Sequence, residues 1–415
     1  MRLIKYFFIF FFLNHFIAEA QDSLYARQVI NTLCAAKFHG RGYVKRGDEK
    51  AAAFIASQFS SLGLSPLTET YYQPFHFPVN TFPSAMKIKV DGRKLIAGAD
   101  YIIHPASSGV NKSYQLQYID SAGLLDALAQ PGNTCLVIST KDFNAQRESA
   151  SPLLSKKQSG AVLFVEEKKL TWSVAQYHYS IPIATALRNK ILPTSKRIYI
   201  YNKALFIENY KTQNVLALVK GKSTTDSMLV FTAHYDHLGM MGRHTYFPGA
   251  NDNASGMAML LNLAKYYAKV ENKPNHNLLF IAFAGEEAGL VGSKYFTEHP
   301  MVELIKIKFL INLDLLGTGD DGMMVVNATE HKNEFNRLKQ INEEHHYMST
   351  IGERGQARNS DHYYFSEKKV PAFFFYTMGG IQAYHDIYDK PETLPLTKFK
   401  EVFLLIRDFA EEINR

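Results

Sequence analysis

The second half of the chain constrains the fold most, because compact apolar runs alternate there with stretches of helical periodicity. The apolar runs from residue 213 onward are Val215–Val219, Met228–Ala233, Leu278–Phe283, Phe309–Leu313, Met323–Val326 and Ala372–Tyr376. One helical stripe lies between the second and third runs, and another, from Phe399 to Ile413, closes the chain. Strands that alternate with helices favour a sheet covered on both faces. We therefore predict an α/β fold, a three-layer α/β/α sandwich with a mixed, mostly parallel central sheet.

A different pattern precedes this region. Residues 22–36 and 48–62 have the apolar spacing of helices, whereas residues 86–212 contain short β-type runs and many turns. A chain of 415 residues has room for two domains, or for one large domain with an insertion. We predict that residues 21–85 and 213–415 form the main domain and that residues 86–212 form a mostly-β inserted domain.

The first twenty residues have the pattern of a secretory signal peptide. Arg2 and Lys5 precede the apolar run 7–13, and residues 18–20 have the small-x-small pattern that signal peptidase cleaves. A transmembrane anchor is the alternative, but the run is too short for a hydrocarbon core of about 30 Å. We expect cleavage before Gln21, export to the periplasm or the medium, and no stable membrane insertion afterwards.

Composition excludes several classes of protein. With 46% apolar and 20% charged residues, the chain is neither disordered nor collagen-like. Cys34 and Cys135 are too few for a disulfide scaffold or a four-thiolate zinc site, and we expect free buried thiols rather than a pair. The net charge of +7 is concentrated in residues 86–212, which hold 17 Lys and Arg against 9 Asp and Glu. This surplus is weak support for an acidic partner, and we expect no nucleic acid partner.

Side chains of the kind that bind metals follow four of the apolar runs. They are His234 with Asp236, Glu286 with Glu287, Asp314, and His385, and Asp252 precedes the first long helix of this region. Ligands bind α/β sheets at the carboxyl ends of strands, so these side chains are expected to converge on one cleft.

Each of these residues alone has an ordinary structural explanation, such as a histidine satisfied in the core, a helix start or a turn-capping carboxylate. Asp314 is harder to explain in this way, because a carboxylate between apolar neighbours at a strand end demands a partner or a metal. A set that mixes imidazole and carboxylate groups suits zinc.

Five motifs in this region resemble those of the M28 family of zinc aminopeptidases. They are His234-x-Asp236, Asn251-Asp252-Asn253-Ala254-Ser255-Gly256, Gly285-Glu286-Glu287-x-Gly289-Leu290-x-Gly292-Ser293, Asn312-Leu313-Asp314 and Tyr384-His385. The resemblance covers residues 213–415, and Phe38-His39-Gly40-Arg41-Gly42 matches a pattern that precedes the catalytic core in exported members. It implies that residues 21–85 and 213–415 make the catalytic peptidase domain. Residues 86–212 would then resemble a protease-associated domain, which either caps the cleft or acts as a spacer.

The resemblance further implies a co-catalytic site with two zinc ions. The ligands would be His234 and Asp314 for one ion, Glu287 and His385 for the other, and Asp252 as the bridge between them. Glu286 would be the general base, which takes a proton from a bridging water and passes it to the leaving amine. Asp236 would orient His234 through the second ring nitrogen, with a turn-capping carboxylate as the alternative.

Four more residues are candidates for contact with the substrate. Asp361 lies in a stretch that resembles one lining the site in the family, with a local cap as the alternative. Arg358 could meet a substrate carboxylate, and either Tyr376 or the metals alone could stabilise the oxyanion. Tyr384 is a candidate because it precedes the last ligand. In addition, Asp389 matches a family carboxylate near that ligand, or is a plain turn residue.

The implied activity is hydrolysis of the N-terminal peptide bond, with peptides that have a free N-terminus as partners. A glutaminyl cyclase, on a related fold with one zinc, is a second hypothesis; that group typically has a tryptophan near the last histidine, whereas Trp172 lies in the insertion. A non-catalytic binding protein would have lost ligands or the base, and none is missing. A carboxypeptidase for acidic C-termini would need a basic pocket, which the sequence does not reveal.

Overall fold

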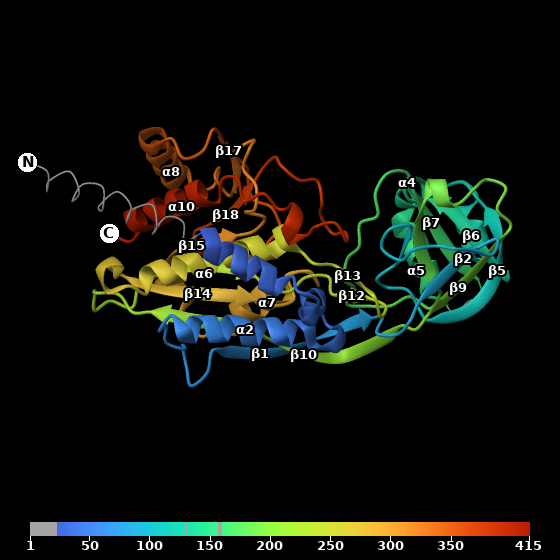
Figure 1. Cartoon of the computed structure of the whole chain (residues 1–415), viewed down its shortest axis with the longest axis horizontal. Helices are drawn as coiled ribbons and strands as arrows, with labels where there is room; N and C mark the ends of the chain where they lie inside the picture. The colour runs from blue at the N-terminus through green and yellow to red at the C-terminus, as the bar shows by residue number, and fades with distance from the viewer. Residues whose placement is uncertain (1–22, 130–131, 157–159) are drawn as a thin grey trace, which may run out of the picture.

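Two eight-stranded sheets organise the chain (Figure 1). The computed structural model describes residues 23–129, 132–156 and 160–415. The first sheet lies in the larger body, and the second lies in a smaller body at the other end of the long axis. The predicted signal peptide, residues 1–20, lies outside the described residues.

The first sheet is mixed, with parallel strands at its centre, as predicted. Its strands in spatial order are β1 (Tyr72–Thr81), β10 (Leu205–Val219), β14 (Asn277–Phe283), β11 (Met228–His234), β15 (Ile307–Leu313), β18 (Ala372–Thr377), β16 (Met323–Val326) and β17 (Ile351–Glu353). The four strands β14, β11, β15 and β18 are parallel. β10 and β16 flank them in the antiparallel direction. The carboxyl ends of the four central strands therefore lie along one edge of the sheet.

Helices cover both faces of this sheet, which gives the predicted three layers. One face packs against the helix at residues 23–33, α2 (Gly47–Ser61), α6 (Gly256–Tyr267), α8 (Lys332–His345) and α10 (Phe399–Ile413). The other face packs against α7 (Val291–Glu298) and α9 (His362–Glu367). Successive residues of a strand belong to different cores, because neighbouring side chains point to opposite faces of the sheet. Phe280, for example, belongs to the first core and Ile281 to the second.

The second sheet lies within the predicted insertion. Its strands in spatial order are β3 (Arg93–Lys94), β2 (Lys87–Val90), β9 (Arg197–Asn202), β5 (Val110–Tyr118), β6 (Thr134–Ser139), β7 (Ala161–Glu166), β8 (Ile183–Leu187) and β4 (Tyr101–Ile103). The helices α3 (Leu124–Ala129), α4 (Thr140–Asn144) and α5 (Arg147–Leu154) cover one face of it. Both cysteines are buried and free, as expected.

The second sheet ends before residue 212, the boundary drawn from the sequence. β1 pairs with β10 from Tyr72↔Val215 to Thr81↔Leu205, so residues 205–212 belong to the first sheet. The last strand of the second sheet, β9, ends at Asn202. Residues on either side of this point have β-type patterns, so the sequence gives no signal of the change of sheet.

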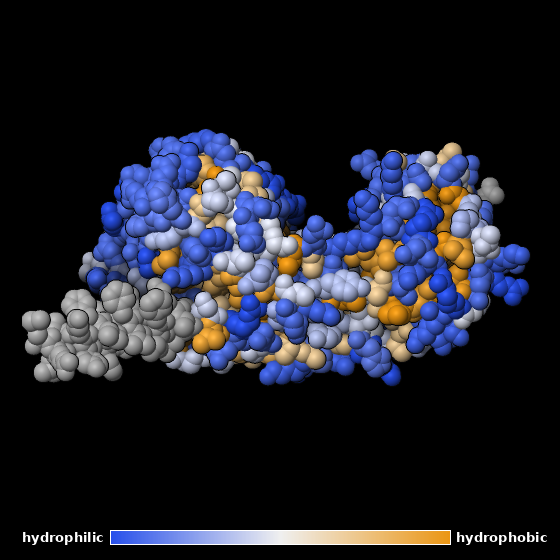
Figure 2. Space-filling view, turned by 45° about the horizontal axis from the view of Figure 1, so that its top comes forward, coloured by the Kyte–Doolittle hydropathy of each residue, from blue (hydrophilic) through white to orange (hydrophobic). Residues whose placement is uncertain are grey.

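The inserted domain also packs against the larger body. The core on the other face of its sheet contains Trp172 together with Leu238, Met241 and Phe247, which come from the segment between β11 and α6. The short strands β12 (Met240–Met241) and β13 (Thr245–Tyr246) pair within this segment. Figure 2 shows two lobes that are joined below a hollow. Among the helices of the described residues, we find none with the length and apolar character needed to cross a membrane.

Candidate metal centre

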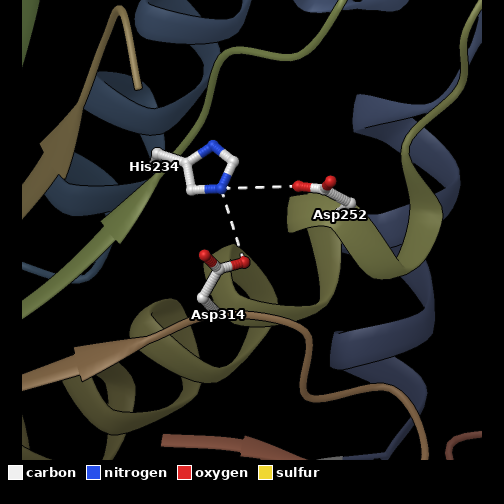
Figure 3. A group of neighbouring side chains, drawn as sticks. All are labelled: His234, Asp252 and Asp314. Carbon is white, nitrogen blue, oxygen red and sulfur yellow. Dashed lines mark ion pairs between the residues drawn. The ribbon is translucent and has the colours of Figure 1, made fainter. Parts of the chain in front are cut away.

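Three predicted ligands meet at the edge where the parallel strands end (Figure 3). His234 is the last residue of β11, Asp314 follows β15 directly, and Asp252 lies in the segment Ala250–Ser255 before α6. His234 Nε2 lies 3.4 Å from Asp252 Oδ1 and 3.4 Å from Asp314 Oδ1. All three side chains are buried. One donor atom from each lies within 4.8 Å of the others, which is close enough for a single ion.

A second group of donors lies on the other side of Asp252. His385 Nε2 is 3.0 Å from Asp252 Oδ2 and 3.1 Å from Glu287 Oε2. His237, which the sequence analysis did not select, joins this group with Nδ1 at 2.6 Å from Glu287 Oε1 and 3.9 Å from Asp252 Oδ1. The sequence signal that could have identified His237 is its position directly after His234-x-Asp236. Asp252 thus presents Oδ1 to His234 and Oδ2 to His385, and the more distant His237 also lies on the Oδ1 side.

Glu286 lies beside the first group, with Oε2 at 3.9 Å from His234 Nε2. Burial raises the pKa of Glu286 well above its usual value. The carboxylates of Glu287 and Asp361 raise it further, while His234 acts in the opposite direction. The side chain therefore combines proximity to the donors with a high affinity for a proton.

The donor set fits divalent zinc. The carboxylates of Asp252, Glu286, Glu287 and Asp314 are between 3% and 14% exposed. Burying so many anionic groups together costs free energy unless cations compensate them. Asp314 Oδ1 accepts no hydrogen bond from the described residues, so a lone pair is available to an ion. Imidazole nitrogen and carboxylate oxygen are both zinc ligands.

Asp236 supports this site through the main chain of the glutamates. Its carboxylate accepts the backbone N–H groups of Glu286 at 3.2 Å and Glu287 at 3.3 Å, and the Tyr43 hydroxyl at 2.8 Å. The Nδ1 atom of His234 lies 3.2 Å from the backbone oxygen of Asp236 and 3.8 Å from its carboxylate. The histidine is thus held mainly by the main chain of Asp236, and the carboxylate positions the two glutamates.

The neighbours of Asp252 hold it against the end of β15. Asn253 Nδ2 donates to the backbone oxygen of Leu313 at 2.9 Å. Asp389 accepts the N–H groups of Asn251 at 2.8 Å and Asp252 at 3.0 Å. Asp389, for which the sequence left two interpretations, therefore contacts the backbone of a predicted ligand directly.

Arg41 ties several of these loops together. The side chain is fully buried. Its guanidinium donates, at 2.6–3.3 Å, to the backbone oxygens of Leu33, Tyr235, Pro248, Gly249 and Asp252. The motif around Arg41 thereby connects the N-terminal part of the chain to the segments that carry Asp236 and Asp252.

A buried carboxylate near Asp236 predicts a pH dependence of stability. Asp48 accepts hydrogen bonds from Tyr210 at 2.7 Å and Thr212 at 2.8 Å, and burial raises its pKa to about 7. Because folding raises the pKa of this acid, the free energy of unfolding falls as the pH rises from about 4, the unfolded value, through about 7. We expect a smaller fall between pH 5 and pH 8 in metal-free Asp48→Asn than in the metal-free original protein. Urea denaturation measures both, and equal falls would contradict this role of Asp48.

A pocket of about 210 Å³ opens over the two donor groups. Its walls, apart from the predicted ligands and Glu286, are Leu315, Arg354, Asn359, Phe374, Tyr376 and Tyr384. The Tyr384 ring stacks on His385 with 4.0 Å between centroids. The structure therefore brings both tyrosine candidates to the pocket.

Asp361 and Arg358 do not line this pocket. Asp361 is fully buried, and burial raises its pKa to about 7. Arg358 donates to the Tyr364 hydroxyl at 2.8 Å. The arginine on the pocket wall is Arg354, four residues earlier, whose Nη1 donates to the Tyr376 hydroxyl at 2.9 Å. The pocket wall therefore has Arg354, from the same loop, where the sequence analysis suggested Arg358.

Comparison with known proteins defines the class of this fold. The solved structure of a zinc aminopeptidase from Bacillus subtilis has a TM-score of 0.73 against this chain at 21% identity, and the match covers 94% of each chain. The two chains therefore share a fold over this length, and the matched length includes the inserted domain.

Sequence comparison finds a family model that matches the second half of the chain. The model of peptidase family M28 matches residues 214–410, which contain all of the predicted metal ligands. Over that segment the chain is similar to peptidase family M28. Aminopeptidase YwaD of Bacillus subtilis is 26% identical over 293 residues, which are 65% of this chain and 57% of that protein. A "Probable zinc metalloprotease" of Pyricularia oryzae is 35% identical over 116 residues, 27% of this chain and 23% of that protein. The matched parts thus span less than two thirds of these relatives.

Proposed function

We propose that this chain is an exported zinc aminopeptidase that removes the N-terminal residue from peptides with the help of two zinc ions. The observation that carries the proposal is the position of Asp252, whose Oδ1 faces His234 and whose Oδ2 faces His385. The family match, the relative named aminopeptidase YwaD and the solved structure named as a zinc aminopeptidase support the same activity. The signal-peptide pattern of residues 1–20 supports export.

The proposed ligands divide into two sets that share one residue. His234 and Asp314 would hold one ion, Glu287 and His385 the other, and Asp252 both. When bound, two such ions lower the pKa of a water between them and polarise the substrate carbonyl. The distances of 3.0–3.4 Å between imidazole and carboxylate atoms support this division.

Glu286 is the proposed general base. It adjoins the ligand Glu287, but its side chain faces His234 rather than His385. A carboxylate in this position can take a proton from water and give it to the leaving amine within one cycle. The carboxylate of Asp236 supports this role, because it fixes the backbone of both glutamates.

The pocket walls suggest how a substrate would lie. Tyr384 and Phe374 offer aromatic surface beside the donors, while Arg354 and Asn359 offer polar contacts. We propose Tyr376 and Tyr384 as substrate contacts, and Arg354 in place of Arg358.

Metal removal and readdition test this function. We expect the purified protein to release the chromophore from aminoacyl chromogenic substrates, to lose this activity in a chelator, and to regain it with zinc. The matched N-acetyl substrates should not be cleaved, because they lack the free amino group. Metal analysis should find two zinc ions per chain. Cleavage of the acetylated substrate, or activity undiminished after complete metal removal, would contradict the proposal. One zinc ion with cyclisation of N-terminal glutamine would favour a glutaminyl cyclase.

The position of Arg354 on the pocket wall is compatible with a second function. A carboxypeptidase for acidic C-termini needs a cation in its pocket, and the Arg354 guanidinium lies on the wall with a neutral tyrosine as its hydrogen-bond partner. Peptides blocked at one end distinguish the two activities. An aminopeptidase cleaves those with an amidated C-terminus, whereas a carboxypeptidase cleaves those with an acetylated N-terminus.

A further inference from the structure

The inserted domain contacts His385 directly. The backbone N–H of Trp172 donates to the backbone oxygen of His385 at 2.9 Å, and His385 Nδ1 lies 3.1 Å from the backbone oxygen of Trp172. The other ring nitrogen, Nε2, faces Asp252 and Glu287. A carbonyl oxygen can only accept, so Nδ1 must carry the proton in this contact. The Nε2 lone pair is then directed toward the proposed metal position.

Trp172 is itself firmly anchored. Its side chain is only 5% exposed. The indole ring stacks on Phe247 with 4.7 Å between centroids and 19° between planes, and Nε1 donates to the backbone oxygen of Ile103 at 2.7 Å. Ile103 belongs to β4 of the second sheet, while Phe247 belongs to the larger body. The carbonyl that meets His385 is therefore held by both bodies of the protein.

Two neighbours of Trp172 contact the loops of the second donor group. Lys169 Nζ lies 3.0 Å from Asp386 Oδ2, next to His385, and donates to the backbone oxygen of Gln382 at 2.9 Å. Gln176 Nε2 donates to the backbone oxygen of Ala288, the residue after Glu287, at 2.6 Å. The segment 169–176 thus touches both loops that carry the ligands of one proposed ion.

His385 needs such support from outside its own loop. Its φ angle is 54°, in the left-handed region that residues other than glycine adopt at a cost. The ring stacks on Tyr384, which is 44% exposed, and meets the His237 ring edge-on with 5.9 Å between centroids. The Trp172 backbone provides one hydrogen bond to the main chain of His385 and one to its ring.

We propose that segment 169–176 of the inserted domain is a positioning element for the metal site formed by Glu287 and His385. It acts by fixing the orientation of the His385 imidazole, so the insertion is part of the active site and not a spacer. The inference rests on the proposed function, because it takes His385 as a zinc ligand. His234 and Asp314 have no such contact with this segment among the bonds of the described residues, so the effect is confined to one ion.

Zinc titration of the metal-free protein against a competing chelating dye tests this inference without reference to activity. Lys169→Glu places a negative charge beside Asp386, and Trp172→Ala removes the anchor of the carbonyl. Each should weaken the binding of one zinc equivalent about 10-fold or more and leave the other within about twofold. Lys168→Glu, the same charge change at the exposed neighbouring residue, is the matched control and should bind both ions as the original protein does.

His385→Ala distinguishes an error in the ligand assignment from an error in the positioning role of the insertion. It should weaken the same zinc equivalent as Lys169→Glu does. If His385→Ala leaves both equivalents unchanged, the ligand assignment in the proposed function is wrong. If His385→Ala weakens one equivalent but folded Lys169→Glu and Trp172→Ala bind zinc like Lys168→Glu, the positioning role of the insertion alone is overturned. Circular dichroism of each variant verifies folding, and Lys169→Glu alone decides the test if Trp172→Ala is unfolded.

Discussion

Replacement of Glu286 by glutamine is expected to lower kcat for aminoacyl substrates about 10²–10⁴-fold, the range that general acid–base catalysis contributes. Glutamine keeps the size of the side chain and removes the site that would receive the proton. The backbone N–H of residue 286 still reaches Asp236, so the loop should keep its position. Zinc content should also stay the same, because Glu286 is not among the proposed ligands.

Glu287→Gln is the matched control for this prediction. The substitution is identical and lies one residue further along, but it alters the side chain that contacts His385 at 3.1 Å and His237 at 2.6 Å. This variant should lose affinity for zinc, and excess zinc should restore part of its activity. Rescue of Glu286→Gln by zinc, or equal product release by Glu286→Gln and the original protein, would show that Glu286 is not the base.

The positions of the predicted ligands followed from elementary rules. Each apolar run from residue 228 to 376 folds as a strand of the first sheet, and parallel strands place their carboxyl ends together. Asp314 was the most informative single residue, because its apolar neighbours predicted a buried carboxylate and it is 6% exposed. The family resemblance added the division of roles, which periodicity cannot supply.

Contacts between segments far apart in the chain could not be predicted from such rules. Trp172 and His385 are separated by 213 residues, and no local pattern relates them. In the same way, Arg354 and Arg358 lie in one irregular loop, where neither period 2 nor period 3.6 determines which side chain faces the pocket. His237 had a local signal, but a histidine beside a predicted ligand is as easily explained as an ordinary buried residue.

Through these long-range contacts, both the insertion and the N-terminal segment support the loops of the candidate site. Trp172 reaches the site from the inserted domain, while Arg41 reaches it from the segment before the first sheet. Trp172 contributes its own main-chain carbonyl to the His385 ring, whereas the Arg41 side chain donates to main-chain carbonyls, which any residue provides. Three stretches of sequence therefore contact the proposed metal centre, although residues 214–410 contain all of its proposed ligands.

The second large effect is expected at Arg41. Arg41→Met should lower the free energy of unfolding by at least about 3 kcal/mol, because the charged donor of five hydrogen bonds is lost and buried carbonyl oxygens remain without partners. Methionine fills much of the volume, so the loss reports hydrogen bonding more than a cavity. Urea denaturation of the metal-free proteins measures the effect without a contribution from zinc binding.

Two further variants make this result specific. Arg41→Lys keeps the charge but lacks the planar fork that reaches carbonyls on several segments, so its stability should lie between those of Arg41→Met and the original protein. Arg46→Met removes an exposed arginine that pairs with Glu49, and should change stability by no more than about 1 kcal/mol.

Arg41→Lys should also weaken zinc binding, because Arg41 holds the backbone oxygen of Asp252. Both ions should be affected, since Asp252 faces both donor groups. A loss of stability with unchanged affinity for both ions would mean that Arg41 supports the fold of these loops but not the geometry of the ligand that they carry.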